Sequence, residues 1–520
     1  MLCKYLLLVL LIFGYSEYNI QINNDIIIFT LINYKKSITK HKTKQYAIFN
    51  IDSYHRIEPF GYPNIPIIRK AFIGSNKFKI LESKGYLIKT EKIFPIIKSQ
   101  SRCDYQNKYN ISFDNIYKKN SFIPNMPISI QYYNNGQSNI KILEIQPLQY
   151  NPYNDTIYVN TFIKIKIYPT KEKLRVTYTE NKLYNKILLN YKYIEKNIIP
   201  ERVLIVAHDR YYTIGTRFAK HRNITNDVIY KKISEIGNNI KLKEYIKKLY
   251  QETDSLKYVI LIGNYGDIKP LESNRYFGNS DSLYGQINDG IINIYVSRIF
   301  GHTIEDVENQ INKIIKFTIP RNKVGFLGIA SDENVPSIPT DCEFIERLHS
   351  TINNMSNIKF DYNKICDPNA SKEQVKRVIN NKEISFVNYI GHGNGTNWIT
   401  SKFGVNDTNL LTKNNFIVVD VACLNGNPYY KPFLAESLLN KKYGAVAMYS
   451  SIPLADWIPP VYMQFHAYHT LLSMTEPITL GMMIYSGTMM SCIQYPSQCG
   501  KMMDGYILYG DSSMPVIIPK

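Results

Sequence analysis

Two short apolar runs in the second half of the chain each end at a reactive side chain. Residues 384–390 (ISFVNYI) are followed by Gly391 and His392, and residues 416–422 (FIVVDVA) are followed by Cys423. Short apolar runs bounded by Gly and Asn are typical of buried parallel strands. In open α/β sheets, the chemistry lies beyond the carboxyl ends of such strands. If the two strands are neighbours, His392 and Cys423 meet at one sheet edge, which favours a cysteine nucleophile with a histidine acid/base.

The chain from Glu201 onward alternates between strand-like and helix-like patterns. Further strands are predicted at residues 202–207, 258–263, 325–330 and 444–449, and helices at residues 241–251, at 303–317 and from about 341. The segment 303–317 carries Val307, Ile311 and Ile314 on one helical face. This alternation predicts a parallel α/β region arranged in two sheets.

The first part of the chain has a different pattern. Residues 17–180 contain mostly strand-like runs, of which residues 25–30 and 161–168 are the clearest. The second run alternates with a period of two, as expected of a half-buried antiparallel strand. Residues 181–200 are polar and rich in lysine, and they end at Pro200. We therefore expect a mostly-β domain, joined to the α/β region by a linker.

The first sixteen residues have the pattern of a signal peptide. Lys4 supplies a short positive region, residues 5–15 are apolar, and Ser16 is a small residue suited to cleavage. The apolar stretch is too short to span a bilayer, and no later run is long enough to do so. The alternative is a buried N-terminal strand. The order of charge and then apolar residues favours secretion.

The positive charge is concentrated in the first 200 residues. The chain carries 62 Lys+Arg and 43 Asp+Glu; residues 1–200 hold 29 and 13 of these, a net of +16, and residues 201–520 hold 33 and 30, a net of +3. A basic half can indicate a nucleic-acid partner. However, the sequence shows no DNA-binding motif and no basic repeat interleaved with aromatics. We therefore favour a solvated, lysine-rich β-domain without a nucleic-acid partner.

The cysteines are spaced unlike those of a zinc site. The chain has seven, at positions 3, 103, 342, 366, 423, 492 and 499, with no CxxC pair. Cys492 and Cys499 are close enough in sequence to pair with each other. Cys423 is expected to stay unpaired, because a disulfide would remove the nucleophile.

A third strand end adds a carboxylate to His392 and Cys423. The predicted strand at residues 325–330 leads to Glu333, which can orient and charge the imidazole of His392. Thiol chemistry also needs backbone N–H groups that face the developing oxyanion, and the amides of Gly393 and Cys423 can supply them. Taken alone, a histidine after a strand is more often structural, and a buried cysteine is more often a small hydrophobe. The three strand ends together favour catalysis.

These residues resemble the motifs of the gingipain family of secreted cysteine peptidases. Residues 387–393 (VNYIGHG), with Trp398 downstream, are similar to the family's histidine motif, and residues 420–427 (DVACLNGN) are similar to its nucleophile motif. Segments with family counterparts also occur at residues 258–267, 281–286, 329–331, 433–436 and 509–513. The resemblance covers residues 201–520 and is closest to the arginine-specific members.

The resemblance implies a caspase-like α/β catalytic region with two parallel-sheet subdomains, preceded by a mostly-β pro-domain. The expected division is a signal peptide at 1–16, a pro-domain at 17–198, subdomain A at 199–324 and catalytic subdomain B at 325–520. The roles implied are Cys423 as nucleophile, His392 as acid/base, Glu333 as its acidic partner, and the Gly393 and Cys423 amides as the oxyanion hole.

The resemblance also implies two substrate-binding residues. Asp341 matches the acidic residue at the floor of the family's P1 pocket, where a carboxylate suits a guanidinium through bidentate pairing. Trp457 resembles the aromatic residue that lines that pocket, although the segment 450–457 departs from the family pattern. Without the resemblance, Asp341 would equally fit a helix N-cap. Family members bind calcium, but the metal ligands here stay unassigned; Asp281 and Asp289 are candidates.

The sequence therefore predicts a secreted or cell-surface cysteine endopeptidase. It would be made as a zymogen, and the mature enzyme would cleave after basic residues, with arginine favoured. The chemistry would need no cofactor, although a structural calcium ion is compatible with the family. Its partners would be protein or peptide substrates and its own pro-domain, released by cleavage near Lys192 or Lys196. Two rivals are a sortase-like transpeptidase of the same family and a non-enzymatic binding protein on the same scaffold.

Overall fold

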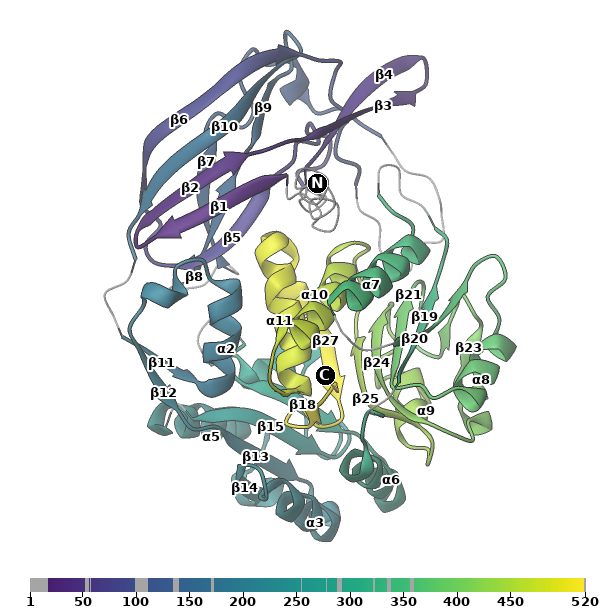
Figure 1. Cartoon of the computed structure of the whole chain (residues 1–520). Coiled ribbons are helices and arrows are strands. Elements are labelled where there is room, and N and C mark those ends of the chain that lie inside the picture. The colour runs from purple at the N-terminus through teal and green to yellow at the C-terminus, as the bar shows by residue number, and fades with distance from the viewer. Residues whose placement is uncertain are drawn as a thin grey trace, which may run out of the picture.

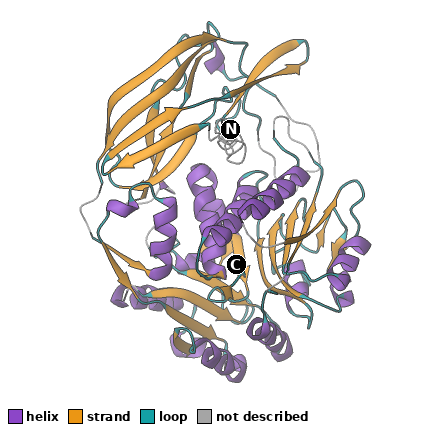
Figure 2. Ribbon diagram, viewed as in Figure 1, coloured by secondary structure: helices purple, strands orange, loops and turns teal. Residues whose placement is uncertain are grey.

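The computed structural model describes residues 17–518, except residues 52–55, 57, 99–110, 134–139, 170–172, 254, 277, 288–291, 321–322, 334–337 and 356–359. A β-rich N-terminal part, coloured purple to blue in Figure 1, lies above an α/β part coloured teal to yellow. Two helices, α10 (Pro459–Ser473) and α11 (Leu480–Gln494), lie in the centre, and α11 contacts strands of both parts (Figures 1 and 2).

The N-terminal part consists of antiparallel strands, as predicted. One sheet has the order β1 (Tyr18–Asn23), β2 (Ile26–Leu31), β10 (Thr156–Ile167) and β6 (Phe78–Lys89), with β9 (Leu148–Asn151) also paired to β10. A second sheet has the order β5 (Ile68–Ile73), β8 (Ile140–Ile145) and β7 (Ile128–Tyr132), and β3 (Lys35–His41) forms a hairpin with β4 (Lys44–Asn50). The period-two pattern explains the packing, because Ile27, Phe29 and Leu31 are buried while the residues between them are partly exposed.

The expected linker at 181–200 is instead a structured segment. It contains most of α2 (Tyr178–Ile187) and all of β12 (Lys196–Ile199), and β12 pairs in parallel with β11 (Leu174–Thr177), the strand just before α2. Helix α2 begins with a capping box between Thr177 and Glu180. Tyr191 is buried, and the Asn190 amide donates to Ile73 O and accepts from Ile73 N. The high lysine content made the segment look like a linker. The bonds between Asn190 and Ile73 attach it to the β-rich part.

The α/β part is built on one ten-stranded sheet. In pairing order, its strands are β14 (Asp227–Lys232), β13 (Arg202–Ala207), β15 (Leu256–Ile262), β18 (Tyr295–Ile299), β27 (Tyr506–Tyr509), β25 (Gly444–Ser451), β24 (Asn415–Val421), β21 (Phe386–Ile390), β19 (Val324–Ala330) and β20 (Phe360–Cys366). All neighbours are parallel except β25 and β27, so two parallel halves meet at one antiparallel pair. The two predicted sheets are thus joined into one, and β27, from near the end of the chain, completes the first half.

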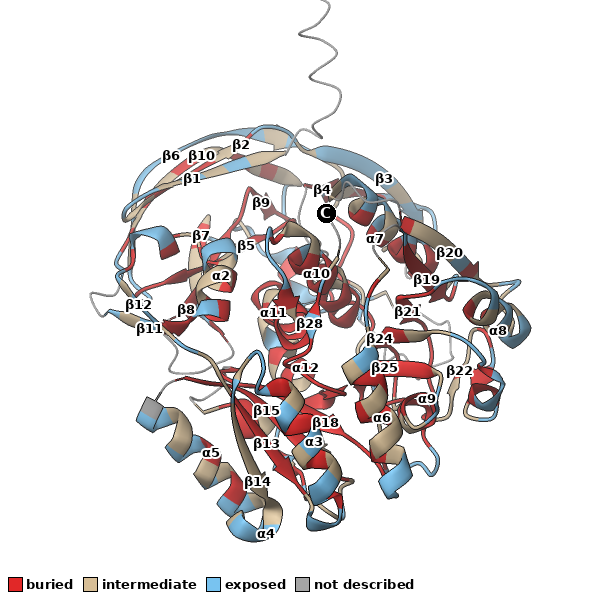
Figure 3. Ribbon diagram, turned by 60° about the horizontal axis from the view of Figure 1, so that its bottom comes forward, coloured by how far each residue is buried: buried red, intermediate tan, exposed pale blue. Residues whose placement is uncertain are grey.

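Helices bury both faces of this sheet. They are α3 (Tyr212–Arg222), α4 (Ile233–Ile236), α5 (Asn239–Thr253), α6 (Ile304–Lys316), α7 (Asp341–Met355), α8 (Lys372–Asn381), α9 (Leu434–Leu439), α10, α11 and α12 (Cys499–Gly505). Successive residues of a strand enter different cores: Ile417 packs in the cluster that includes α10 and α11, and Val418 packs with α8 and α9. Burial on both faces explains why the strands read as continuous apolar runs. Figure 3 shows the sheet and α11 as mostly buried.

The predicted helix at 303–317 corresponds to α6, which starts with a capping box between Thr303 and Asp306 and buries Val307, Ile311 and Ile314. The apolar run at 481–490 lies inside the buried helix α11. Among the described residues, no helix has the length and hydropathy needed to span a membrane.

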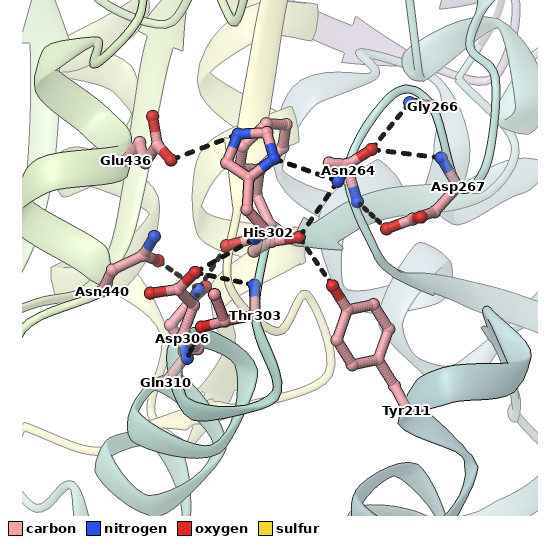
Figure 4. Close-up of polar contacts among 12 residues, drawn as sticks. Tyr211, Asn264, Gly266, Asp267, His302, Thr303, Asp306, Gln310, Glu436 and Asn440 are labelled. Carbon is pink, nitrogen blue, oxygen red and sulfur yellow. Dashed lines mark hydrogen bonds and ion pairs between the residues drawn. The ribbon is translucent and has the colours of Figure 1, made fainter.

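Polar side chains join the two halves of the sheet at the loops after β15 and β18 (Figure 4). His302 Nε2 lies 3.4 Å from a Glu436 carboxylate oxygen on α9, and His302 Nδ1 lies 3.2 Å from the Asn264 amide nitrogen. Gln310 Nε2 donates to Asn440 Oδ1 at 2.7 Å. Burial raises the pKa of Glu436 above its ordinary value, although His302 opposes that rise. The loops of one half are therefore tied to α9, which follows the nucleophile strand of the other.

A fully buried ion pair organises the first half. Arg298 on β18 donates from Nε and Nη2 to the two carboxylate oxygens of Asp281, at 2.6 and 2.7 Å. The same guanidinium donates to the carbonyl oxygens of Gly263, Asn264 and Ile268 in the loop after β15. A buried charge is tolerated only when it is paired and its donors are satisfied, and this arrangement meets both conditions.

We expect Arg298→Ala to lower the free energy of unfolding by about 3–5 kcal/mol, because it leaves the buried Asp281 unpaired. Equilibrium denaturation in guanidinium chloride measures this change. Arg202→Ala is the matched control: it removes the exposed pair with Asp227 and should cost less than about 1 kcal/mol. Equal effects of the two substitutions would contradict the importance of the buried pair.

Candidate active site

Three neighbouring parallel strands bring the three predicted catalytic residues to one sheet edge. Strand β21 pairs with β24 on one side and with β19 on the other. Ile390, the last residue of β21, is level with Val421 of β24 and with Ala330 of β19. The expectation that the histidine and cysteine strands are neighbours is therefore confirmed.

His392 is bound to the predicted acidic partner. Its Nε2 lies 2.8 Å from the carboxylate of Glu333, which comes three residues after β19. The imidazole is almost fully buried, whereas the Glu333 side chain is about 29% exposed. The Trp457 ring packs edge-on against the imidazole, with ring centroids 5.6 Å apart. A carboxylate in this position orients the imidazole and stabilises its protonated form.

A second carboxyl group stands near Glu333 and was not foreseen. Asp367 follows β20, and its backbone N–H donates to Ala330 O at 3.3 Å. Burial, and next the nearby Glu333 charge, raise the pKa of Asp367 above its ordinary value. The sequence signal was present, because Asp367 follows a strand directly, as Glu333 nearly does. The order of strands that makes it a neighbour of Glu333 was not visible in the sequence.

Cys423 follows β24 and is fully buried. The backbone N–H of Ala455 donates to its Sγ at 3.3 Å. The expectation that this cysteine is unpaired is wrong for this structure, in which Cys423 is disulfide-bonded. The other described cysteines form the pairs Cys342–Cys366 and Cys492–Cys499, the second as foreseen. Cys3 and Cys103, the two remaining cysteines, lie outside the described residues.

Gly393 lies where no larger residue fits. A Cβ atom on it would stand 2.4 Å from Cys423 O and 2.9 Å from both Ala422 Cβ and Asn425 Nδ2. The backbone after His392 therefore runs directly against the nucleophile turn. In that turn, Leu424 adopts a φ of +66°, which is uncommon for a residue with a side chain. The two backbone segments thus approach so closely that only glycine fits at position 393, and the turn after Cys423 carries backbone strain at Leu424.

A buried carboxylate supports β24, the strand that leads to Cys423. Asp420, three residues before Cys423, accepts from Trp398 Nε1 at 2.8 Å and from Ser450 Oγ at 2.5 Å. Trp398 itself stacks between Tyr389 and Phe403. A charged residue inside an apolar run could have signalled such a network, but its partners come from the loop after β21 and from β25.

Asp341 is not the cap of its helix. Thr340 and Glu343 form the reciprocal capping pair at the start of α7, with bonds of 2.8 and 3.1 Å. The Asp341 side chain is fully buried and accepts from Ser331 Oγ at 2.7 Å. The N-cap is therefore Thr340, and the buried Asp341 carboxylate lies in the first turn of α7.

Trp457 belongs to the same neighbourhood. It is buried in a hydrophobic cluster with Ile390 and Cys342, the residue after Asp341. The disulfide Cys342–Cys366 joins the first turn of α7 to the end of β20. The structure thus places Trp457 between the histidine and the start of α7.

The two calcium candidates have different outcomes. Asp281 is committed to the ion pair with Arg298, so its carboxylate is not available as proposed. Asp289 lies outside the described residues. Within the described part of the chain, no group of three or more His, Cys, Asp or Glu side chains is arranged to hold a metal ion.

Comparison with known proteins supplies the family. The profile of Peptidase family C25 matches residues 199–517, which is more than half of the chain. The chain belongs to Peptidase family C25. It is therefore a cysteine-type endopeptidase, and its α/β part is a caspase-like catalytic region.

The curated relatives are gingipains. Gingipain R2 of Porphyromonas gingivalis is 25% identical over 96% of this chain and 72% of its own length. Gingipain R1 of the same species is 26% identical over 88% of this chain and 50% of its own length. Among solved structures, the Arg-specific cysteine proteinase gingipain R has a TM-score of 0.56 and 26% identity, and the alignment covers 61% of this chain and 78% of that one. The complex of the RgpB pro- and mature domains from P. gingivalis has the same TM-score and identity.

Because Cys423 is disulfide-bonded, we expect the intact chain to be inactive until a thiol reductant is added. Dithiothreitol should expose one additional thiol at Cys423 to iodoacetamide and should start the cleavage of peptide amides. A non-reducing peptide map would identify the partner among the remaining cysteines. Alkylation of Cys423 without reductant would contradict this expectation.

We expect Glu333→Gln to lower kcat about 10²-fold, the lower end of what acid–base groups contribute, because it removes the charge that orients His392. KM should change little, since the group does not face the substrate side chain. Steady-state kinetics on the reduced enzyme separate the two constants. Asp332→Asn, at the exposed neighbouring position, is the control and should retain wild-type kcat.

Proposed function

We propose that this peptidase cleaves peptide bonds after basic residues, with arginine favoured, through an acyl-cysteine intermediate. The buried carboxylate of Asp341 is the observation that carries the preference. It lies at the start of α7, is not used for capping, and is one residue from the cluster that holds Trp457. A carboxylate at the floor of a pocket suits a substrate guanidinium, which pairs with it bidentately. The names of the relatives, which include an Arg-specific proteinase, agree with this preference.

The chemistry uses the reduced thiol of Cys423. His392 takes the thiol proton, and the thiolate attacks the carbonyl carbon of the scissile bond. The amides of Gly393 and Cys423 stabilise the oxyanion, and the tight packing of Gly393 on the nucleophile turn supports this pairing. His392 then returns its proton to the leaving amine, and the acyl-cysteine forms. A water molecule, deprotonated by His392, hydrolyses that thioester and restores the thiol.

The β-rich part is proposed to be a pro-domain that covers the active site until it is cut away. Arg69 Nη1 on β5 donates to Gln494 O at 2.6 Å, and Gln494 Nε2 donates back to Arg69 O. Tyr18 and Lys70 line a cavity of about 750 Å³ together with residues of α7 and α10. The β-rich part therefore bonds to α11, and it faces α7 and α10 across this cavity. The solved complex of RgpB pro- and mature domains is a precedent for such an arrangement.

Maturation is proposed to occur near Lys192 or Lys196. Lys192 is exposed in the short turn after α2, whereas Lys196 lies in β12 and bonds to Tyr191 O. Lys192 is therefore the more accessible of the two. The division into residues 17–198, 199–324 and 325–520 is retained for the proposed processing, although β27 pairs within the first half of the sheet. Secretion, with residues 1–16 as signal, and a structural calcium ion remain part of the proposal.

The decisive experiment compares wild type, Cys423→Ala and Asp341→Asn on peptides that end in Arg-amide, Lys-amide or citrulline-amide dyes, after reduction. Cys423→Ala should abolish turnover and also remove the processed band that corresponds to residues 193–520. Asp341→Asn should selectively lose Arg and Lys substrates, because the neutral amide no longer pairs with a cation.

Equal turnover by wild type and Cys423→Ala would rule out the nucleophile. An added amine found in the product mass would instead indicate the transpeptidase. Absence of labelling of reduced Cys423 by an arginyl electrophile would indicate a binding protein.

A further inference from the structure

Ser331 connects three elements of the catalytic edge through three different groups. It is the first residue after β19 and is almost fully buried. Its N–H donates to Ile390 O at 3.1 Å, and its carbonyl accepts from Cys342 N–H at 2.9 Å. Its hydroxyl donates to Asp341 Oδ2 at 2.7 Å. The residue therefore bonds the histidine strand, the start of α7 and the proposed specificity carboxylate at once.

These bonds place Ser331 between the proposed catalytic residues and the proposed P1 pocket. Glu333 follows Ser331 by two residues, and His392 follows Ile390 by two residues. A shift of Ser331 would thus move the carboxylate that orients the imidazole and the carboxylate that would bind the substrate side chain. The two functions depend on a single short segment after β19.

The backbone on both sides of Asp341 is already held. Thr340 and Glu343 close the capping box before and after it, and the disulfide at Cys342 ties the same turn to β20. These constraints act on the main chain. The Ser331 hydroxyl acts on the Asp341 carboxylate itself and so sets the direction in which its oxygens face.

We propose that Ser331 is a positioning residue that orients Asp341 for bidentate pairing with the guanidinium of an arginine substrate. The proposal rests on the assignment of Asp341 as the specificity residue. An ionised carboxylate offers about four acceptor directions, and the bond from the Ser331 hydroxyl fixes how its oxygens are turned. Bidentate pairing requires both oxygens in one plane with the fork, and for this reason the orientation matters more for arginine than for a neutral side chain.

The test uses Ser331→Ala in the full chain after reduction and processing. For an Arg-amide substrate, KM should rise about 10-fold, the lower range for a hydrogen bond to a charged group, while kcat changes little. Turnover of the citrulline-amide substrate should be unchanged, because it does not need the carboxylate. Ser331→Thr keeps the hydroxyl and should restore the wild-type KM for arginine.

Ser513→Ala is the matched control. Ser513 Oγ also donates to a buried carboxylate, Asp511 Oδ1, at 2.7 Å, but it lies beyond the end of β27 that is remote from Cys423. This variant should keep the wild-type KM for every substrate. Thermal denaturation of both variants checks that they are folded to the same extent.

A double mutant distinguishes the positioning role of Ser331 from the assignment of Asp341 as the specificity residue. In the Asp341→Asn background, Ser331→Ala should add no further loss on arginine, since the bond has no carboxylate left to orient. If Asp341→Asn keeps the preference for arginine over citrulline, the assignment of Asp341 fails and the role of Ser331 fails with it. If Asp341→Asn loses that preference but Ser331→Ala leaves KM unchanged, or lowers kcat equally for arginine and citrulline, only the positioning role is overturned.

Discussion

The register of three parallel strands is the constraint on which the active site depends. Hydrogen bonds align the last residues of β19, β21 and β24, so the residues that follow them emerge side by side. Adjacent strands are about 4.8 Å apart, which brings the segments after Ala330, Ile390 and Val421 within side-chain reach of one another. A shift of one residue in either pairing would turn the side chains to the opposite face and separate His392 from Glu333. The flanking loops and helices refine a geometry that the sheet already imposes.

Buried charges are placed where that geometry needs a fixed direction. Asp420 holds the nucleophile strand through Trp398 and Ser450, and Asp341 is held by Ser331. The ion pair of Arg298 with Asp281 orients the guanidinium that bonds the loop after β15. Each of these groups accepts or donates bonds to elements distant in sequence, because an unpaired buried charge would cost several kcal/mol. The apolar cores supply cohesion, and these polar contacts supply orientation.

Much of the architecture was predictable because it depends on local patterns. Apolar runs with period two predicted the β-rich part, and continuous runs separated by helical patterns predicted the parallel α/β part. The segment 181–200 was misjudged because its lysines obscure the buried Tyr191 and because the capping box that starts α2 lies just before it, at Thr177 and Glu180. The state of Cys423 was also misjudged, since a disulfide depends on which cysteine is near in space. Asp367 and Asp420 were missed because their roles arise from neighbours on other strands.

The sequence by itself determined most of the secondary elements and the family motifs, since each of these depends on a short stretch of chain, and it supplied the candidates for the reactive side chains. It also left Asp341 two roles: a helix N-cap or, as the family resemblance implies, the acidic residue at the floor of the P1 pocket. Only the tertiary structure excluded the cap, because the capping pair of Thr340 and Glu343 and the bond from Ser331 require a folded turn against β19. The merging of two predicted sheets into one was decided in the same way. Strand order and side-chain direction depend on contacts between distant segments, and no local pattern encodes them.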